Sequence, residues 1–158
     1  MGNIFSGSEI VELGINIEEN GRDFYNNLAK QSKSKRAKEV FEFLAGEEER
    51  HIKVFQGLLA KTTAYEPAGL DADEYSAYMS TLAGEYIFTK KDQGGKIAKA
   101  IKSDGEAIDK GIGFEKDSVV FYQGIKKTVP DYDRKIIDEL IFQEESHLLR
   151  LTELKKGL

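Results

Sequence analysis

Apolar residues recur every three or four positions in four long segments of the chain, which is the spacing of one face of an α-helix. The segments cover residues 8–31, 34–61, 104–129 and 131–156. Short polar links join the first segment to the second and the third to the fourth, so each pair is expected to form an antiparallel hairpin. The pattern predicts an all-α protein whose two hairpins make a four-helix bundle, with no strand required.

The segment between the two hairpins, residues 62–103, interrupts this pattern. Pro67 and Gly69 break the helical spacing, and the stretch KKDQGGK breaks it again. We expect a long, partly helical crossover, with one helix from Asp71 to about Phe88 and a shorter second helix. The aromatic residues of this segment are expected to pack against the bundle or a partner subunit: Tyr75, Tyr78, Tyr86 and Phe88.

Composition narrows the classes of partner and site. A length of 158 residues fits one domain spanning residues 1–158, and a net charge of -5 without a basic cluster disfavours binding to nucleic acid or anionic membranes. The chain has neither a basic start followed by an apolar run nor a stretch near the roughly 20 apolar residues of a membrane span, so a cytoplasmic protein without a membrane partner is expected. It contains no cysteine, so any metal must be held by oxygen and imidazole nitrogen.

The two predicted hairpins repeat each other in sequence. The first segment contains GINIEENGRDFY and the third contains GIGFEKDSVVFY, which share Gly-Ile, a glutamate and Phe-Tyr at the same spacings. This alignment pairs Glu18 with Glu115 and Tyr25 with Tyr122. The second and fourth segments both contain Glu-x-x-His, and the chain's only two histidines occupy these motifs.

The repeated residues have the chemistry of a metal site. Positions i and i+3 share one side of a helix, so Glu48 with His51 and Glu144 with His147 can each grip a metal from one side. The other two glutamates lie within apolar stripes, where an uncompensated carboxylate would be costly to bury. Four carboxylates and two imidazoles suit two ions of iron or manganese that share bridging carboxylates. Zinc stays chemically open, although six donors exceed the usual tetrahedral demand of one zinc ion.

Ordinary structural roles compete with this interpretation. One Glu-x-x-His motif alone is weak evidence, and the adjacent Glu47, Glu49 and Glu145 are expected to be solvated surface charges. Tyr25 and Tyr122 follow the repeated glutamates by two helical turns, so each hydroxyl is expected either near the metal site or simply satisfied within the core.

At these residues the sequence resembles the ferritin-like di-iron carboxylate superfamily, and especially its rubrerythrin-like branch. That superfamily uses one glutamate from each of two helices and Glu-x-x-His from each of the other two. The resemblance implies two iron ions and covers nearly the whole chain, and its ligands would be Glu18, Glu48, His51, Glu115, Glu144 and His147. It also implies that Tyr25 and Tyr122 lie beside the irons.

The sequence departs from typical rubrerythrins in two respects. Ser118 stands where they carry an additional glutamate, three residues after the third-helix ligand, and the four-cysteine rubredoxin module is missing. The missing module implies that a separate redox partner protein, or substrate iron itself, supplies electrons. The missing glutamate weakens the assignment as a peroxidase.

The resemblance leads us to expect a di-iron oxidoreductase that reduces hydrogen peroxide or dioxygen and forms a homodimer. Three other functions stay open from the sequence. They are a ferroxidase that stores iron in a multi-subunit cage, a manganese catalase, and a non-enzymatic bundle that binds zinc or manganese structurally.

Overall fold

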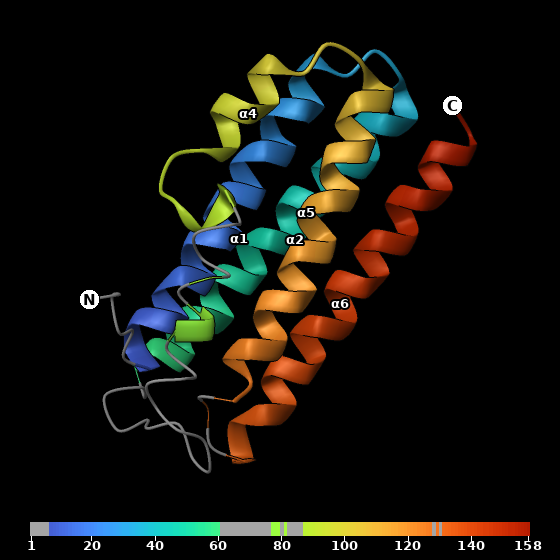
Figure 1. The fold of residues 1–158 in the computed structure, drawn as a ribbon. Helices are drawn as coiled ribbons and strands as arrows, with labels where there is room; N and C mark the ends of the chain where they lie inside the picture. Colours follow the sequence, from blue (N-terminus) through green and yellow to red (C-terminus); the bar gives the residue numbers. More distant parts are fainter. Residues whose placement is uncertain (1–6, 61–76, 80, 82–86, 128, 130) are drawn as a thin grey trace.

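The protein is a bundle of four long helices (Figure 1). The computed structural model describes residues 7–60, 77–79, 81, 87–127, 129 and 131–158, and these contain helices and turns but no strand. The long helices are α1 (Gly7–Gln31), α2 (Lys35–Leu59), α5 (Asp104–Ile125) and α6 (Asp131–Lys156). The predicted all-α fold class is confirmed.

The direction of the helices explains the long crossover. In Figure 1, α1 and α6 run one way along the bundle, whereas α2 and α5 run the other way. The first two helices therefore form one antiparallel hairpin and the last two form the other. Because α2 and α5 are parallel, the chain between them returns along the length of the bundle.

Polar residues at the helix ends define where the helices begin. Ser34 and Ser103 cap α2 and α5, since their hydroxyls accept hydrogen bonds from the backbone N–H groups of Ala37 and Glu106. The predicted third helix extended to about residue 129, but α5 ends at Ile125. Beyond that residue, the backbone N–H groups of 126 and 127 bond to carbonyls in the preceding turn, which closes the helix.

One buried side chain of α1 fastens the crossover to the bundle. The described part of the crossover includes the 3₁₀ turn η2 (Ile87–Thr89) and the short helix α4 (Gly94–Ala100), which lies along α1 in Figure 1. Asn20 donates through Nδ2 to the carbonyls of Phe88 and Lys90, at 2.7 and 2.5 Å. Its Oδ1 accepts from the backbone N–H groups of residues 93 and 94. All four hydrogen-bonding positions of this amide are therefore used.

The crossover aromatics differ in their surroundings. Phe88 is buried and Tyr78 is 45% exposed, while Tyr75 and Tyr86 lie outside the described residues. Most of the helix expected from Asp71 onwards also lies outside them.

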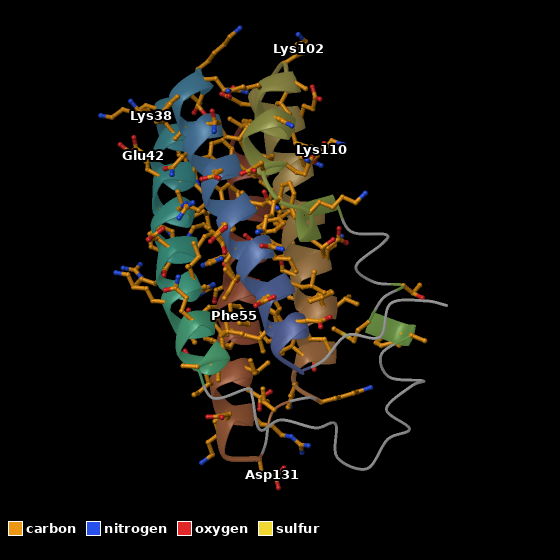
Figure 2. All side chains as sticks on the ribbon, turned by 90° about the vertical axis from the view of Figure 1, so that its left-hand side faces the viewer. Lys38, Glu42, Phe55, Lys102, Lys110 and Asp131 are labelled. Atoms are coloured by element: carbon orange, nitrogen blue, oxygen red, sulfur yellow. The ribbon has the colours of Figure 1, made fainter. Side chains whose placement is uncertain are left out.

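Glycines allow close side-chain packing in both hairpins. A Cβ at Gly14 would lie 3.0 Å from the ring of Phe55, which is labelled in Figure 2 between the two N-terminal helices. A Cβ at Gly111 would lie 3.2 Å from Leu151. These glycines occupy equivalent positions in the repeat, so the same contact recurs in each hairpin. Among the described helices, none is long and apolar enough to cross a membrane.

Candidate metal centre

The structure brings all six repeated acidic and histidine residues together in the middle of the bundle. Each of the four helices contributes, since the repeat places a glutamate on α1 and on α5 and a Glu-x-x-His pair on α2 and on α6. The four glutamates are 0% exposed, and the two histidines are 1% and 3% exposed. The cluster consists of Glu18, Glu48, His51, Glu115, Glu144 and His147.

The six residues form two overlapping groups of potential metal ligands. In the first group, Glu18 and His51 lie with Glu48 and Glu144, and one donor atom from each lies within 4.8 Å of the others. In the second group, Glu48 and Glu144 occur again, together with Glu115 and His147. Sharing of two carboxylates between two groups is the arrangement that bridging ligands of a metal pair require.

The donor atoms converge without satisfying one another. Nδ1 of His51 lies 2.7 Å from Oε1 of Glu144, which makes an ion pair only when the imidazole is protonated. Several fully buried atoms in the cluster have no hydrogen-bond partner: Oε2 of Glu18, Oε2 of Glu115, both carboxylate oxygens of Glu48 and Glu144, and Nδ1 of each histidine. Buried polar groups are normally paired, so this convergence fits positively charged ions held between them.

The pKa shifts of the clustered residues also indicate that the metal-free site lacks positive charge. Burial, together with the neighbouring carboxylates, raises the pKa of Glu48 and of Glu144 well above the ordinary value. Burial alone would lower the pKa of His51, but Glu18 and Glu144 outweigh burial and raise that pKa to about 11. Burial opposes ionisation of Glu18 as well, yet the charge of His51 and hydrogen bonding bring the pKa of Glu18 below its usual value.

Each tyrosine hydroxyl donates to the glutamate of the opposite hairpin. Tyr25 Oη donates to Oε1 of Glu115 at 2.6 Å, and Tyr122 Oη donates to Oε1 of Glu18. Helical side chains lean towards the helix N-terminus, so a tyrosine two turns after a glutamate reaches back to the level of the cluster. Burial and the nearby carboxylates raise the pKa of both phenols, which keeps them protonated as donors.

The two histidines have different neighbours, although their rings stack with centroids 5.7 Å apart. Nε2 of His51 lies 2.6 Å from Oε1 of Gln143 on α6. The ring of His147 instead meets Phe43 edge-on, with centroids 6.4 Å apart. The equivalent of Gln143 in the first hairpin is Glu47, which bonds to Arg50.

Other glutamates of the acidic stretches lie towards the surface. Glu49 bonds to Arg22 at 2.9 Å, and Glu145 is exposed. Gln143 was not found from the sequence, and its place in the repeat gives no signal, since Glu47 at the equivalent position bonds to Arg50 and not to a histidine. Ser118 is buried and donates to the carbonyl of Phe114 at 2.9 Å, which is a bond within its own helix.

Comparison with known proteins identifies the family. The rubrerythrin family model matches residues 9–155, which is nearly the whole chain. The chain belongs to the rubrerythrin family. No curated protein matches this member of the family.

A solved structure supports the relationship of fold. This chain is similar to a protein of Thermotoga maritima that is provisionally described as a ferritin-like diiron-carboxylate protein. The two are 25% identical with a TM-score of 0.68, and the match covers 99% of this chain and 98% of the other. The ferritin-like fold expected from the sequence is therefore confirmed. Membership of this family and the buried cluster together indicate a metal site suited to iron.

Proposed function

We propose that this rubrerythrin is a di-iron oxidoreductase that reduces hydrogen peroxide or dioxygen. The observation that carries the proposal is the pair of donor groups joined by Glu48 and Glu144. Such an arrangement suits two ions at once, whereas a single structural ion would need fewer donors. When bound, a di-iron pair supplies two electrons to an O–O bond.

The chain's own residues have distinct roles in this proposal. Glu48 and Glu144, which belong to both donor groups, would bridge the pair, while Glu18 with His51 would hold one ion and Glu115 with His147 the other. Each tyrosine hydroxyl holds Oε1 of a terminal glutamate, and this oxygen lies 3.4 Å from Nδ1 of His51 for Glu18 and 3.6 Å from Nδ1 of His147 for Glu115. The phenols would thereby position these carboxylates for a metal. Burial of the cluster keeps bulk water away from the donors.

Electron supply and assembly belong to the same proposal. No cysteine is present for an iron–sulfur or rubredoxin-like centre, so electrons would come from a separate donor protein.

Phe142 and Leu149 of α6 are 63% and 60% exposed and lie two turns apart, which suits contact with a second copy in a homodimer. Sedimentation analysis of a Phe142→Lys variant tests this, since the variant should shift towards monomer.

Anaerobic titration with Fe(II) tests the metal site. We expect two ions per chain, followed by oxo-bridged Fe(III) absorption on addition of one equivalent of hydrogen peroxide. Glu144→Gln should abolish this stoichiometry, whereas Glu145→Gln, a change at the exposed neighbouring residue, should preserve it. Binding of fewer than two ions, or the absence of oxidation by both peroxide and oxygen, would refute the proposed activity.

A further inference from the structure

A cavity lies beside the candidate metal centre, on the side formed by α1 and α5. Its volume is about 430 Å³, which falls within the range of roughly 300–1,000 Å³ that is typical of small-molecule sites. The described lining comes from α1, η2, α4 and α5, and none of it comes from the helices that carry the histidines. The apolar lining residues are Ile17, Phe24, Phe88, Ile97 and Phe114.

Aromatic rings form the wall between this cavity and the carboxylates. Phe114 and Phe88 have ring centroids 4.6 Å apart, and Phe24 lies 5.4 Å from Phe88. A Cβ added at Gly21 would lie 2.6 Å from the ring of Phe114 and 3.4 Å from the carboxyl carbon of Glu48. The ring and the carboxylate thus approach the same small patch of α1 backbone. One aromatic side chain therefore lies between the apolar space and the cluster.

Four polar residues also line the cavity: Asp109, Lys110, Asp117 and Ser118. Ser118 is 1% exposed, and its hydroxyl oxygen can still accept a hydrogen bond while donating within its own helix. Lys110 extends outward from α5 (Figure 2), and Asp109 pairs with Lys155 at 2.7 Å. The half-buried Asp117 also lines the cavity, and burial raises the pKa of its carboxyl group. This layout combines an apolar body of space with a buried hydroxyl, a half-buried carboxyl and charged groups.

We propose that the cavity binds the hydrocarbon part of organic hydroperoxides and makes them substrates of this rubrerythrin. The inference rests on the proposed peroxide-reducing function and specifies its substrate class. Hydrogen peroxide is polar and close in size to water, whose share of liquid volume is about 30 Å³, so it needs no apolar space of this size. An alkyl or aryl group gains free energy by leaving water for such a surface.

The reaction consumes two electrons and two protons for each hydroperoxide. The O–O bond of ROOH breaks, one oxygen stays on carbon as the alcohol ROH, and the other leaves as water. The electrons come from the reduced iron pair of the proposed function, which the separate electron-donor protein then reduces again. The alcohol product keeps the hydrocarbon group and can therefore serve as an unreactive probe of the cavity.

Gly113 provides a variant that fills the cavity without threatening the fold. It lines the cavity, is exposed, and no described atom lies within 4 Å of an added Cβ. Leucine also favours a helix interior more than glycine does. Gly57 of α2 is equally open but belongs to another helix, so Gly57→Leu is the matched control.

Binding of 2-phenylpropan-2-ol to the protein as purified, measured by titration calorimetry, tests the cavity itself. We expect saturable binding with one molecule per chain, at least tenfold weaker in Gly113→Leu and unchanged in Gly57→Leu. Absence of saturable binding, or equal affinity in the wild type and in Gly113→Leu, would overturn the proposal.

Stopped-flow oxidation of the reduced, iron-loaded protein tests the substrate class. The rate constant with cumene hydroperoxide, relative to that with hydrogen peroxide, should fall at least tenfold in Gly113→Leu. If this ratio is the same in both proteins while hydrogen peroxide still reacts, the cavity inference is wrong and the proposed function stands. If neither peroxide oxidises the iron-loaded wild type, the proposed function fails and this inference fails with it.

Discussion

Nε2 of His51, on α2, lies 2.6 Å from Oε1 of Gln143, on α6. The other end of the same amide donates from Nε2 to Glu139 at 3.1 Å, which leaves Oε1 as the acceptor for the imidazole N–H. Nε2 therefore keeps its hydrogen, and Nδ1, which faces the carboxylates, is the nitrogen that would release its proton and bind a metal. Because His147 meets Phe43 instead, the two halves of the centre are not equivalent.

Replacement of Gln143 by leucine should weaken one metal site and spare the other. Loss of the acceptor removes the bond that orients His51, and loss of such a bond typically costs about 10–100-fold in metal affinity. Anaerobic titration with Co(II), followed by its visible absorption, resolves successive binding steps. Gln56→Leu, at an exposed glutamine of α2, is the control and should change neither step. Equal weakening of both steps in Gln143→Leu would contradict the assigned asymmetry.

The repeat in the sequence was sufficient to predict the bundle and to single out the six clustered residues. Ligand chemistry restricts those positions to few residue types, and helical spacing fixes which of them share a face. The difference between the histidines was not predictable in this way, because it depends on how the α2 and α6 side chains meet. Glu47 and Gln143 occupy equivalent positions, yet only the glutamine bonds to a histidine.

The site's surroundings depend on contacts between distant segments. Asn20 looks like an ordinary polar residue of a helix, and its role follows only from where residues 88–94 return to α1. The cavity has the same origin, since its walls come from α1, the crossover and α5. Local sequence patterns carry little information about such pairings.

Replacing Asn20 by alanine should release the crossover from α1. The change removes two donated and two accepted hydrogen bonds, each contributing about 0.5–1.5 kcal/mol, so we expect a loss of roughly 2–6 kcal/mol in the free energy of unfolding. Hydrogen exchange at the amides of residues 93 and 94 should accelerate most. Asn26→Ala, at an exposed position of α1, is the control.

Asn20→Asp gives a sharper version of the same test. A carboxylate can accept from the two backbone N–H groups but cannot donate to the carbonyls of Phe88 and Lys90. We therefore expect aspartate not to restore the stability lost in the alanine variant. Full restoration would show that the two donated bonds are unimportant.

Removal of either buried phenol should destabilise the protein to a similar extent. Tyr25→Phe and Tyr122→Phe keep the ring but leave a buried carboxylate oxygen without its donor, at a cost of about 1–3 kcal/mol. Urea denaturation of the protein as purified measures this. Tyr78→Phe, which changes a 45% exposed residue, should have little effect. A negligible effect of both buried substitutions would show that the phenols only fill space.

Metal-free protein should become less stable as pH rises from about 6 to 9. Folding raises the pKa of Glu48 and of Glu144, so above about pH 4.5 the folded state holds protons that the unfolded chain has released, and stability falls. His51 acts in the same direction, since its contribution is full below the unfolded pKa of 6.5 and is lost as pH approaches 11. Glu18, with its lowered pKa, contributes stability above about pH 4.5 that is lost only in acid.

The magnitude and sign of this pH dependence can be checked with one substitution. Each proton held only by the folded state lowers the free energy of unfolding by about 1.4 kcal/mol per pH unit. Urea denaturation of chelator-treated protein at several pH values should therefore give a falling curve, and Glu48→Gln should flatten it by removing one titrating group. Bound metal requires deprotonated ligands, so added Fe(II) under anaerobic conditions should stabilise the protein more at pH 8 than at pH 6. Metal-free stability that does not fall across this range would mean that the buried carboxylates are ionised without metal, and that the cluster is less enclosed than its burial implies.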